Sequence, residues 1–366
     1  MGGAEKIKIG IVGTGGIANA HVKQYITFDD AEIVGACDIV PGKAREFLDK
    51  YGLTAVPAFE NVGELIKNVQ MDGASVCTYH RTHAECTIAL LEAGINVLCE
   101  KPMSFTLQEA ADMVRASKKA KKILTIGFQP RFNKLRQKVD NMISSGLLGK
   151  IYYAESGGGR RRGLSEGNFI RKDTAGFGCL GDIGCYSVDQ CLHALGYPKP
   201  LTVSAMTSCH FGTNPKYTPY ADLFEVDDFA SAYVRLEGDI TYMFKQSWAM
   251  HIDTLGDSFW LGTEGAIKLV TGFNELNKPS RYMYYTDVNG QHIDSFILPS
   301  TPFDAYGTGA PEDEWREKIR SYINAIRNNG PAPIPGEEIL YNQAILDGIY
   351  RSSILKKEVE ITIPEI

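Results

Sequence analysis

A glycine-rich turn between an apolar run and a helical pattern constrains the fold of this chain most strongly. Residues 6–13 read KIKIGIVG, and the turn that follows, GTGGIA, fits the pattern G-x-G-x-x-A. In that pattern the first glycine allows a tight turn, the second lets a pyrophosphate approach the backbone, and the small last residue lets the helix pack closely. The free amides of the helix N-terminus then face the phosphates. We therefore predict a dinucleotide site formed by Gly13, Gly15, Gly16 and Ile17.

The first 125 residues continue with alternating strand-like and helix-like segments. Strands are expected at 32–38, 72–78, 96–99 and 123–128, and helices at 17–28, 43–51, 82–93 and 107–120. Such an alternation indicates a doubly wound parallel sheet. Residues 1–125 are therefore predicted to form an α/β Rossmann domain that binds a nicotinamide dinucleotide.

Beyond residue 149 the pattern changes to longer strands and tight turns. Strands are expected at 150–156, 201–211, 229–236, 242–250, 259–261, 266–270, 282–286, 292–296 and 359–363. Turns such as Asn289-Gly290 join several of them into consecutive hairpins, which indicate a mostly antiparallel sheet. Residues 126–366 are therefore predicted to form an α+β domain with a large open sheet. Its C-terminal helices, at 312–329 and 336–353, are expected to pack back on the Rossmann domain.

Composition narrows the class of protein. The net charge of −6 over 366 residues argues against a nucleic-acid partner, because binding phosphates needs concentrated basic surface. No apolar run approaches the roughly 20 residues that cross a bilayer, and residues 1–9 are too short and charged for a secretory signal. The eight cysteines form no C-x-x-C pair, and His83-x-x-Cys86 has no second half at metal spacing. We expect a soluble cytoplasmic protein with reduced thiols and no metal site.

Asp38 bears on the choice between NAD and NADP. It closes the expected strand 32–38, where an acid can hydrogen-bond the adenosine ribose hydroxyls. The same acid would repel a 2′-phosphate, and the next two residues are apolar. The sequence therefore favours NAD, while Lys43 and Arg45 lie close enough in sequence to keep NADP open.

Three further groups carry candidate chemistry. The charged pair Glu100-Lys101 follows the strand 96–99, at the end of the sheet that lines the ligand crevice. The alternative for this pair is a surface ion pair of little energetic value. Asp182, Tyr186 and Asp189 follow one another at spacings of four and three, so their side chains can share a helix face, contact the substrate and serve in proton transfer. The alternative for them is an Asp N-cap beside a core tyrosine.

The third group is Arg160-Arg161-Arg162, which follows three glycines. A guanidinium presents a fork of donors to substrate oxygens, so these arginines are candidates for substrate contact. The alternative is a solvated loop.

Together these motifs resemble the family of glucose–fructose oxidoreductase, inositol dehydrogenase and the rhizopine catabolism proteins (Gfo/Idh/MocA). The resemblance covers nearly the whole chain. It rests on GTGGIA, Asp38, THAECTIALLEAGINVLCEKP at 82–102, GFQPRF at 127–132, LLGKI at 147–151, the run G-x-G-x-L-x-D-I-G and GEEILYNQAILDGIYRSS near the C-terminus.

The resemblance implies roles for particular residues. It implies that Lys101 is the catalytic lysine and Asp182 the substrate-facing carboxylate. It also implies cofactor contacts from Thr78, His80, His83, Glu100, Lys101 and Gln129. Tyr186 stands where many members carry a histidine, and Tyr79 where many carry proline. The family's open sheet further implies a homo-oligomer.

The reaction expected from this resemblance is NAD-dependent oxidation of a secondary hydroxyl of a sugar, glycoside or polyol. Tyr186 would accept the hydroxyl proton, Lys101 would supply a positive charge, and Asp182 would hold the sugar, although Lys101 and Tyr186 can exchange roles. The branch it looks most like oxidises the C3 hydroxyl of glucosides, which leaves a 3-keto product that a partner lyase can cleave. The alternatives are an NAD-dependent redox glycosidase on the same fold and a non-enzymatic sensor that binds NAD and a partner protein.

Overall fold

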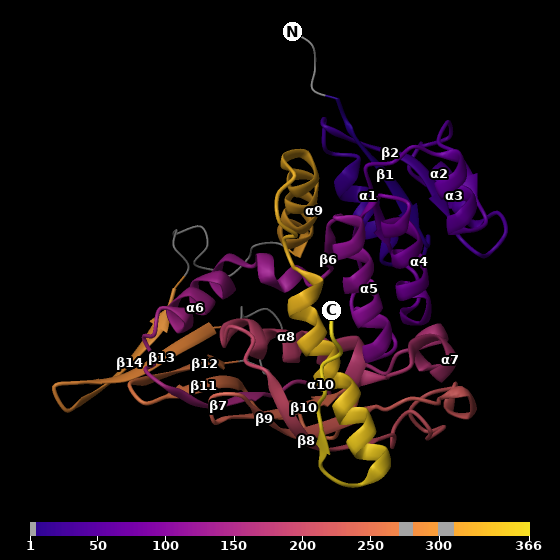
Figure 1. Ribbon diagram of the computed structural model, residues 1–366. Helices are drawn as coiled ribbons and strands as arrows, with labels where there is room; N and C mark the ends of the chain where they lie inside the picture. Colours follow the sequence, from indigo (N-terminus) through magenta and orange to yellow (C-terminus); the bar gives the residue numbers. More distant parts are fainter. Residues whose placement is uncertain (1–4, 271–280, 299–310) are drawn as a thin grey trace. The chain divides into compact units, whose positions relative to one another are not determined.

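The computed structural model describes residues 5–270, 281–298 and 311–366 (Figure 1). Backbone contacts divide the chain into two compact units. The first contains residues 1–129, 312–340 and 364–366, and the second contains residues 130–311 and 341–363. Each unit is therefore assembled from separate stretches of sequence.

The first unit is built on a six-stranded parallel sheet in the order β3-β2-β1-β4-β5-β6. Its strands are β1 (Ile7–Val12), β2 (Ala31–Cys37), β3 (Ala58–Phe59), β4 (Gly73–Val76), β5 (Asn96–Cys99) and β6 (Leu124–Ile126). The chain runs outward from β1 in one direction through β2 and β3, and in the other direction from β4 onward. The strand order thus reverses between β1 and β4, and ligands of such sheets bind beyond the carboxyl ends of the strands at this point.

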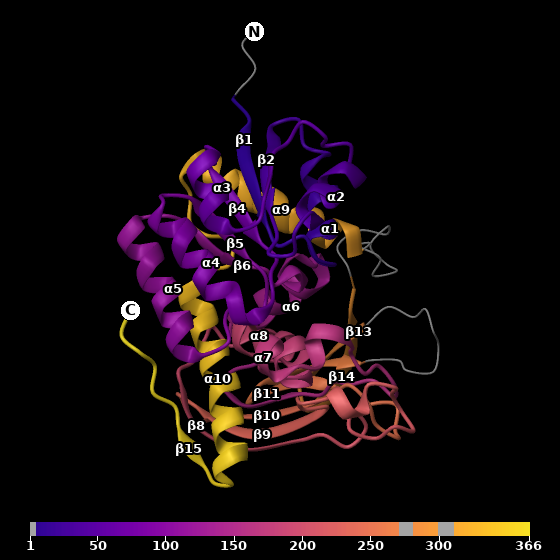
Figure 2. The same ribbon diagram turned by 90° about the vertical axis from the view of Figure 1, so that its right-hand side faces the viewer.

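Helices cover this sheet (Figure 2). They are α1 (Ala18–Tyr25), α2 (Lys43–Lys50), α3 (Val62–Asn68), α4 (His80–Glu92), α5 (Leu107–Ala120) and α9 (Pro311–Asn328). Thr106 and Glu109 form a capping box that fixes the start of α5. Helix α9 returns from late in the sequence and buries Ile319, Tyr322 and Ile323 in the core of this unit.

The second unit is built on a nine-stranded sheet in the order β14-β13-β12-β11-β7-β10-β9-β8-β15. Its strands are β7 (Ile151–Ser156), β8 (Pro200–Ser208), β9 (Phe229–Leu236), β10 (Ile240–Ser247), β11 (Ser258–Gly262), β12 (Gly265–Val270), β13 (Arg281–Val288), β14 (Gln291–Ile297) and β15 (Val359–Glu360). Among the described strands of this second sheet, β7 and β10 pair in parallel, and all other neighbouring strands pair antiparallel.

One face of this sheet carries the helices of the unit. Helix α8 (Cys185–Ala194) contacts β7 and α6 (Lys134–Ser144), and the short helix α7 (Lys172–Ala175) precedes it in the chain. The long helix α10 (Gly336–Leu355) has most of its length in this unit. Alternate residues of β9, from Ala230 to Leu236, are buried, as expected for a sheet covered on one face.

The structure confirms the fold class predicted from the sequence: a parallel Rossmann sheet followed by a mostly antiparallel sheet. The elements β3, α3, α6 and the short α7 were not predicted from the sequence and are additional. Among the residues described, no helix combines the length and the apolar character needed to span a bilayer.

Candidate cofactor and substrate sites

The glycine-rich turn between β1 and α1 has the geometry of a phosphate cradle. Gly13 has a φ of 83° and donates its N–H to the carbonyl of Cys37 at 2.8 Å. A Cβ at Gly13 would lie 2.8 Å from the carbonyl oxygen of Cys77, whereas a Cβ at Gly15 or Gly16 would meet nothing within 4 Å. The first glycine is therefore required by the turn itself, and the other two keep open space in front of the helix N-terminus.

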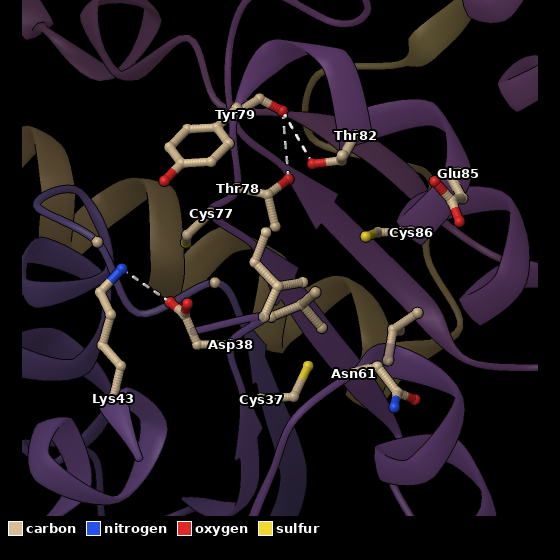
Figure 3. A pocket seen from close by; sticks show the side chains of 15 residues that line it. Cys37, Asp38, Lys43, Asn61, Cys77, Thr78, Tyr79, Thr82, Glu85 and Cys86 are labelled. Atoms are coloured by element: carbon tan, nitrogen blue, oxygen red, sulfur yellow. Dashed lines mark hydrogen bonds and ion pairs between the residues drawn. The ribbon is translucent and has the colours of Figure 1, made fainter. Parts of the chain in front are cut away.

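A pocket with a volume of ≈ 160 Å³ lies beside this turn, at the carboxyl ends of β1, β2 and β4 (Figure 3). The residues that line it are Val12, Gly13, Gly15, Cys37, Asp38, Ile39, Lys43, Asn61, Val62, Cys77, Thr78, Tyr79, Thr82, Glu85 and Cys86. Its walls combine apolar side chains with one buried carboxylate, Asp38. That combination suits a planar base attached to a hydroxyl-bearing ribose.

Asp38 is held firmly at the edge of this pocket. Its Oδ2 accepts hydrogen bonds from the N–H and the hydroxyl of Thr14, both at 2.8 Å, and its Oδ1 accepts one from the N–H of Val40 at 3.0 Å. Burial by itself would raise the pKa of Asp38, but these hydrogen bonds and the ammonium of Lys43 at 3.1 Å outweigh it and lower the pKa. Asp38 is thus a carboxylate at neutral pH.

The ring of His83 contacts the backbone of both Thr78 and Pro102. One ring nitrogen of His83 lies 2.8 Å from the carbonyl oxygen of Pro102, and the other lies 3.2 Å from the carbonyl oxygen of Thr78. Burial lowers the pKa of His83. His83 is therefore an interior residue that links the end of β4 to the loop after β5.

Glu100 is buried in a cluster that we call the Glu100 cluster, composed of Glu100, His21 and Lys318. Its Oε1 lies 2.8 Å from Nε2 of His21 and accepts a hydrogen bond from Nζ of Lys318 at 2.5 Å. Burial would raise the pKa of Glu100, but Lys318 and His21 reverse this effect and lower the pKa well below its usual range. The residue is 3% exposed, and the predicted contact of Glu100 with the cofactor stays a prediction.

Asp182 and Tyr186 lie at the junction of a π-helical turn, Leu180–Gly184, and α8. Turns of this kind are frequent at functional sites. Oδ2 of Asp182 accepts a hydrogen bond from the indole N–H of the fully buried Trp248 at 3.1 Å. Both Asp182 and Tyr186 remain partly exposed, and their predicted contact with the substrate stays a prediction.

Asp189 has different surroundings. It is 2% exposed, and its carboxylate accepts hydrogen bonds from Nη2 of Arg131 at 2.7 Å and from the hydroxyl of Tyr197 at 2.9 Å. Its predicted substrate contact therefore stays a prediction, while its ion pair with Arg131 is part of the interior of the second unit.

Two adjacent carboxylates just before β9 bind the backbone of two loops, one of which leads into Asp182. Asp227 accepts hydrogen bonds from the N–H groups of Gly178 and Leu180, both at 2.8 Å, just before the π-helical turn. Asp228 accepts them from the N–H groups of residues 210–212. These bonds fix the backbone that leads into Asp182 and the loop that follows β8.

The three arginines 160–162 are exposed. The guanidinium of Arg162 lies 5.1 Å from the ring centroid of Phe211 and 5.0 Å from that of Tyr217, and it donates to the carbonyl of Met250 at 2.7 Å. Arg162 therefore belongs to an aromatic cluster in the loops that follow β7, β8 and β10.

The structure brings together part of the predicted cofactor set. Gly13, Gly15, Asp38 and Thr78 line one pocket, and Gly16 adjoins it in the same turn. The sequence did not single out Asn61, Val62, Tyr79, Thr82, Glu85 and Cys86 as lining residues, nor Trp248 and Lys318 as partners of site residues. Within the described part of the chain, no group of three or more His, Cys, Asp or Glu side chains is placed to hold a metal ion.

Comparisons with known proteins agree with this geometry. The chain matches the oxidoreductase family with an NAD-binding Rossmann fold over residues 7–128, and the GFO/IDH/MocA C-terminal domain over residues 136–268. A D-glucoside 3-dehydrogenase of Escherichia coli is 30% identical over 252 residues, which are 67% of this chain and 71% of that protein. A glucose-6-phosphate 3-dehydrogenase of Bacillus subtilis is 26% identical over 337 residues, which are 88% and 89% of the two chains.

Solved structures share the fold over nearly the whole chain. An oxidoreductase domain protein from Kribbella flavida superposes with a TM-score of 0.82 at 22% identity, covering 99% of this chain and 100% of that one. A levoglucosan dehydrogenase solved with NADH superposes with a TM-score of 0.80 at 21% identity, with the same coverage. The motifs, the strand order and both family matches lead to one conclusion: this chain belongs to the GFO/IDH/MocA oxidoreductase family and carries that family's NAD-binding Rossmann domain.

Proposed function

We propose that this protein is an NAD-dependent dehydrogenase that oxidises the C3 hydroxyl of a glucoside. The observation that carries the proposal is the 30% identity, over two thirds of the chain, to a D-glucoside 3-dehydrogenase. A second relative of nearly full coverage is also named a 3-dehydrogenase of a glucose derivative. The aromatic cluster of Phe211, Tyr217 and Arg162 adds a surface that suits a substrate larger than a free sugar.

The residues of the first unit fit NAD. The open space in front of Gly15 and Gly16 admits a pyrophosphate against the backbone, and the ionised Asp38 offers acceptors to ribose hydroxyls while repelling a 2′-phosphate. When bound, the nicotinamide supplies the acceptor for the hydride that leaves the substrate carbon. Thr78, His80, His83, Lys101 and Gln129 are the further residues that we propose around it.

The protein's own residues would handle the proton. We assign Tyr186 as the acceptor of the hydroxyl proton. A free phenol titrates near 10, so Tyr186 needs a nearby cation to act at neutral pH, and we assign that role to Lys101. Asp182, oriented by Trp248, would accept hydrogen bonds from the sugar hydroxyls. The exchange of roles between Lys101 and Tyr186 is the alternative form of this mechanism.

A product analysis tests the proposal. The purified protein is incubated with NAD and a panel of glucose, inositol, methyl glucoside and aryl O- and C-glucosides, and mass spectrometry follows the substrates. We expect products lighter by two hydrogens, with NADH formed in equal amount, and borohydride reduction of the product should give epimers at C3. Oxidation at another carbon would refute the C3 assignment.

Two other outcomes identify the alternative functions. Free aglycone and unoxidised sugar without net NADH would indicate a redox glycosidase. Intact substrates throughout, together with a stable protein partner, would indicate an NAD-binding sensor. We further propose that a separate lyase consumes the 3-keto product, because the keto group acidifies the neighbouring C–H bond and prepares the aglycone for elimination.

A further inference from the structure

Lys318 of α9 is a buried cation that the proposed reaction does not use. Its side chain is 2% exposed, its Nζ donates to Oε1 of Glu100 at 2.5 Å, and it lies 3.8 Å from the ring centroid of Trp315. Burying an ammonium is costly unless it is paired and hydrogen-bonded. Lys318 and Glu100 are 218 positions apart in the sequence, and the fold brings them together as a buried pair. We therefore ask what this pair contributes besides packing.

The partner of Lys318 is fixed in the interior. Besides Lys318, Oε1 of Glu100 contacts His21, whose other ring nitrogen lies 3.0 Å from the hydroxyl of Ser75. A Cβ at Gly127 would stand 2.6 Å from the same Oε1, so glycine at this position leaves room for the carboxylate. The backbone N–H of Glu100 also bonds the carbonyl of Val76 at 3.0 Å. Both the side chain and the backbone of Glu100 are thereby held.

Lys101 lies between two residues whose positions are held by buried polar contacts. Glu100 precedes it, and Pro102 follows it with its carbonyl oxygen 2.8 Å from the buried ring of His83. The backbone from which the Lys101 side chain extends is thus restrained on both sides by buried polar contacts.

We propose that Lys318 is a positioning residue for the proposed catalytic lysine: by holding the Glu100 carboxylate, it fixes the backbone that presents Lys101. The inference rests on the proposed function, in which Lys101 acts on the substrate. Helix α9, which joins the first unit from late in the sequence, then contributes to the chemistry because it carries Lys318. A displacement of about 1 Å at a reacting group can cost 10²-fold in rate, so a restraint of this kind can matter without any contact to the substrate.

Three variants separate positioning from packing: Lys318→Met, Glu100→Gln and the double variant. Each single change leaves one buried charge without the opposite charge that pairs with it, and we expect a lower urea midpoint for both. The double change removes both charges, and replacing a buried ion pair entirely is often neutral for stability. We therefore expect the double variant to regain most of the wild-type midpoint. Arg320→Met is the matched control, because Arg320 lies on the same helix and pairs with the partly exposed Asp30 at 2.9 Å.

Two readouts test the double variant. At saturating NAD and sugar, we expect kcat to stay roughly 10- to 100-fold below wild type although stability has returned. In hydrogen exchange followed by mass spectrometry, we expect faster exchange in the peptide that contains residues 99–104, and wild-type exchange there in Arg320→Met.

A double variant with wild-type kcat and wild-type exchange would overturn the inference and leave the Glu100 cluster as a core ion pair. The exchange measurement does not depend on knowing the substrate. If the wild type oxidises no sugar, the proposed function fails, while the exchange of residues 99–104 still decides whether Lys318 restrains this backbone.

Discussion

Two alanine substitutions in the same glycine-rich turn should affect different properties. One should lower the stability of the cofactor-free protein, and the other should lower its affinity for NADH. Gly13 has a φ of 83°, a region that costs an L-residue roughly 1–2 kcal/mol. Its new Cβ would also stand 2.8 Å from the carbonyl oxygen of Cys77, and overpacking of this kind typically costs about 1–3 kcal/mol. Gly13→Ala should therefore destabilise the cofactor-free protein by about 2–5 kcal/mol.

Gly15→Ala should leave the cofactor-free protein nearly unchanged. A Cβ at this position meets nothing within 4 Å and the backbone has no positive φ, so no contact opposes it. The methyl group instead occupies space that we assign to the pyrophosphate. We expect at least a tenfold loss of NADH affinity, which corresponds to about 1.4 kcal/mol.

Thermal unfolding without cofactor and NADH titration by fluorescence test both halves of this prediction. About 2–4 °C per kcal/mol, the value for domains of 150–250 residues, gives Gly13→Ala a drop of roughly 4–20 °C in Tm. Gly15→Ala should melt within a degree or two of wild type and bind NADH weakly. Wild-type affinity in Gly15→Ala would refute the cradle, and a wild-type Tm in Gly13→Ala would refute the argument from the turn.

Three further predictions concern charged residues. Lys101→Ala should bind NADH normally but lose at least about 100-fold in kcat, and full turnover would contradict its assignment. The hydrogen bonds from Thr14 help to lower the pKa of Asp38 in the folded state. The Asp38 carboxylate therefore stabilises the protein above the pKa of unfolded Asp, and this stabilisation is lost as the pH falls through the pKa of Asp38 in the folded protein. In urea unfolding, the stability deficit of Asp38→Asn should therefore shrink between pH 7 and pH 3, and a pH-independent deficit would contradict the argument. Asp189→Asn should cost about 3–5 kcal/mol, because the buried Arg131 loses the opposite charge of Asp189, with little change in sugar KM. A raised KM at unchanged stability would instead make Asp189 a substrate residue.

Most of the Rossmann unit, apart from β3 and α3, could be predicted because its local signals agree with its burial. The expected strand 96–99 and helix 107–120 coincide with β5 and α5, since the strand is mostly buried and Thr106 caps the helix. Helix α6 gave no such signal. Its buried face includes Arg136 and Asp140, an internal ion pair at 3.2 Å, so charged residues replace the apolar ones that reveal an amphipathic helix.

The site could be predicted only where sequence neighbours carry it. Asp38, Gly13 and Gly15 belong to a local pattern with known mechanics, and the structure places them on one pocket. Lys318 could not be found in this way, because a lysine in an amphipathic helix is expected on the solvent face. Its burial follows from Glu100, and only the folded chain brings the two together. Trp248 is a similar case, since nothing near Asp182 in sequence indicates an indole donor.

Asp182 and Asp189 show why spacing along a helix does not assign function by itself. Both acids were predicted to share one face, and the π-helical turn at Leu180–Gly184 already alters that spacing. Their partners separate them further. Trp248 donates a neutral N–H to Asp182 and orients one of its oxygens, whereas the guanidinium of Arg131 neutralises Asp189 in a buried pair. A carboxylate that must accept sugar hydroxyls needs orientation and exposure together, and of these two acids Asp182 has both.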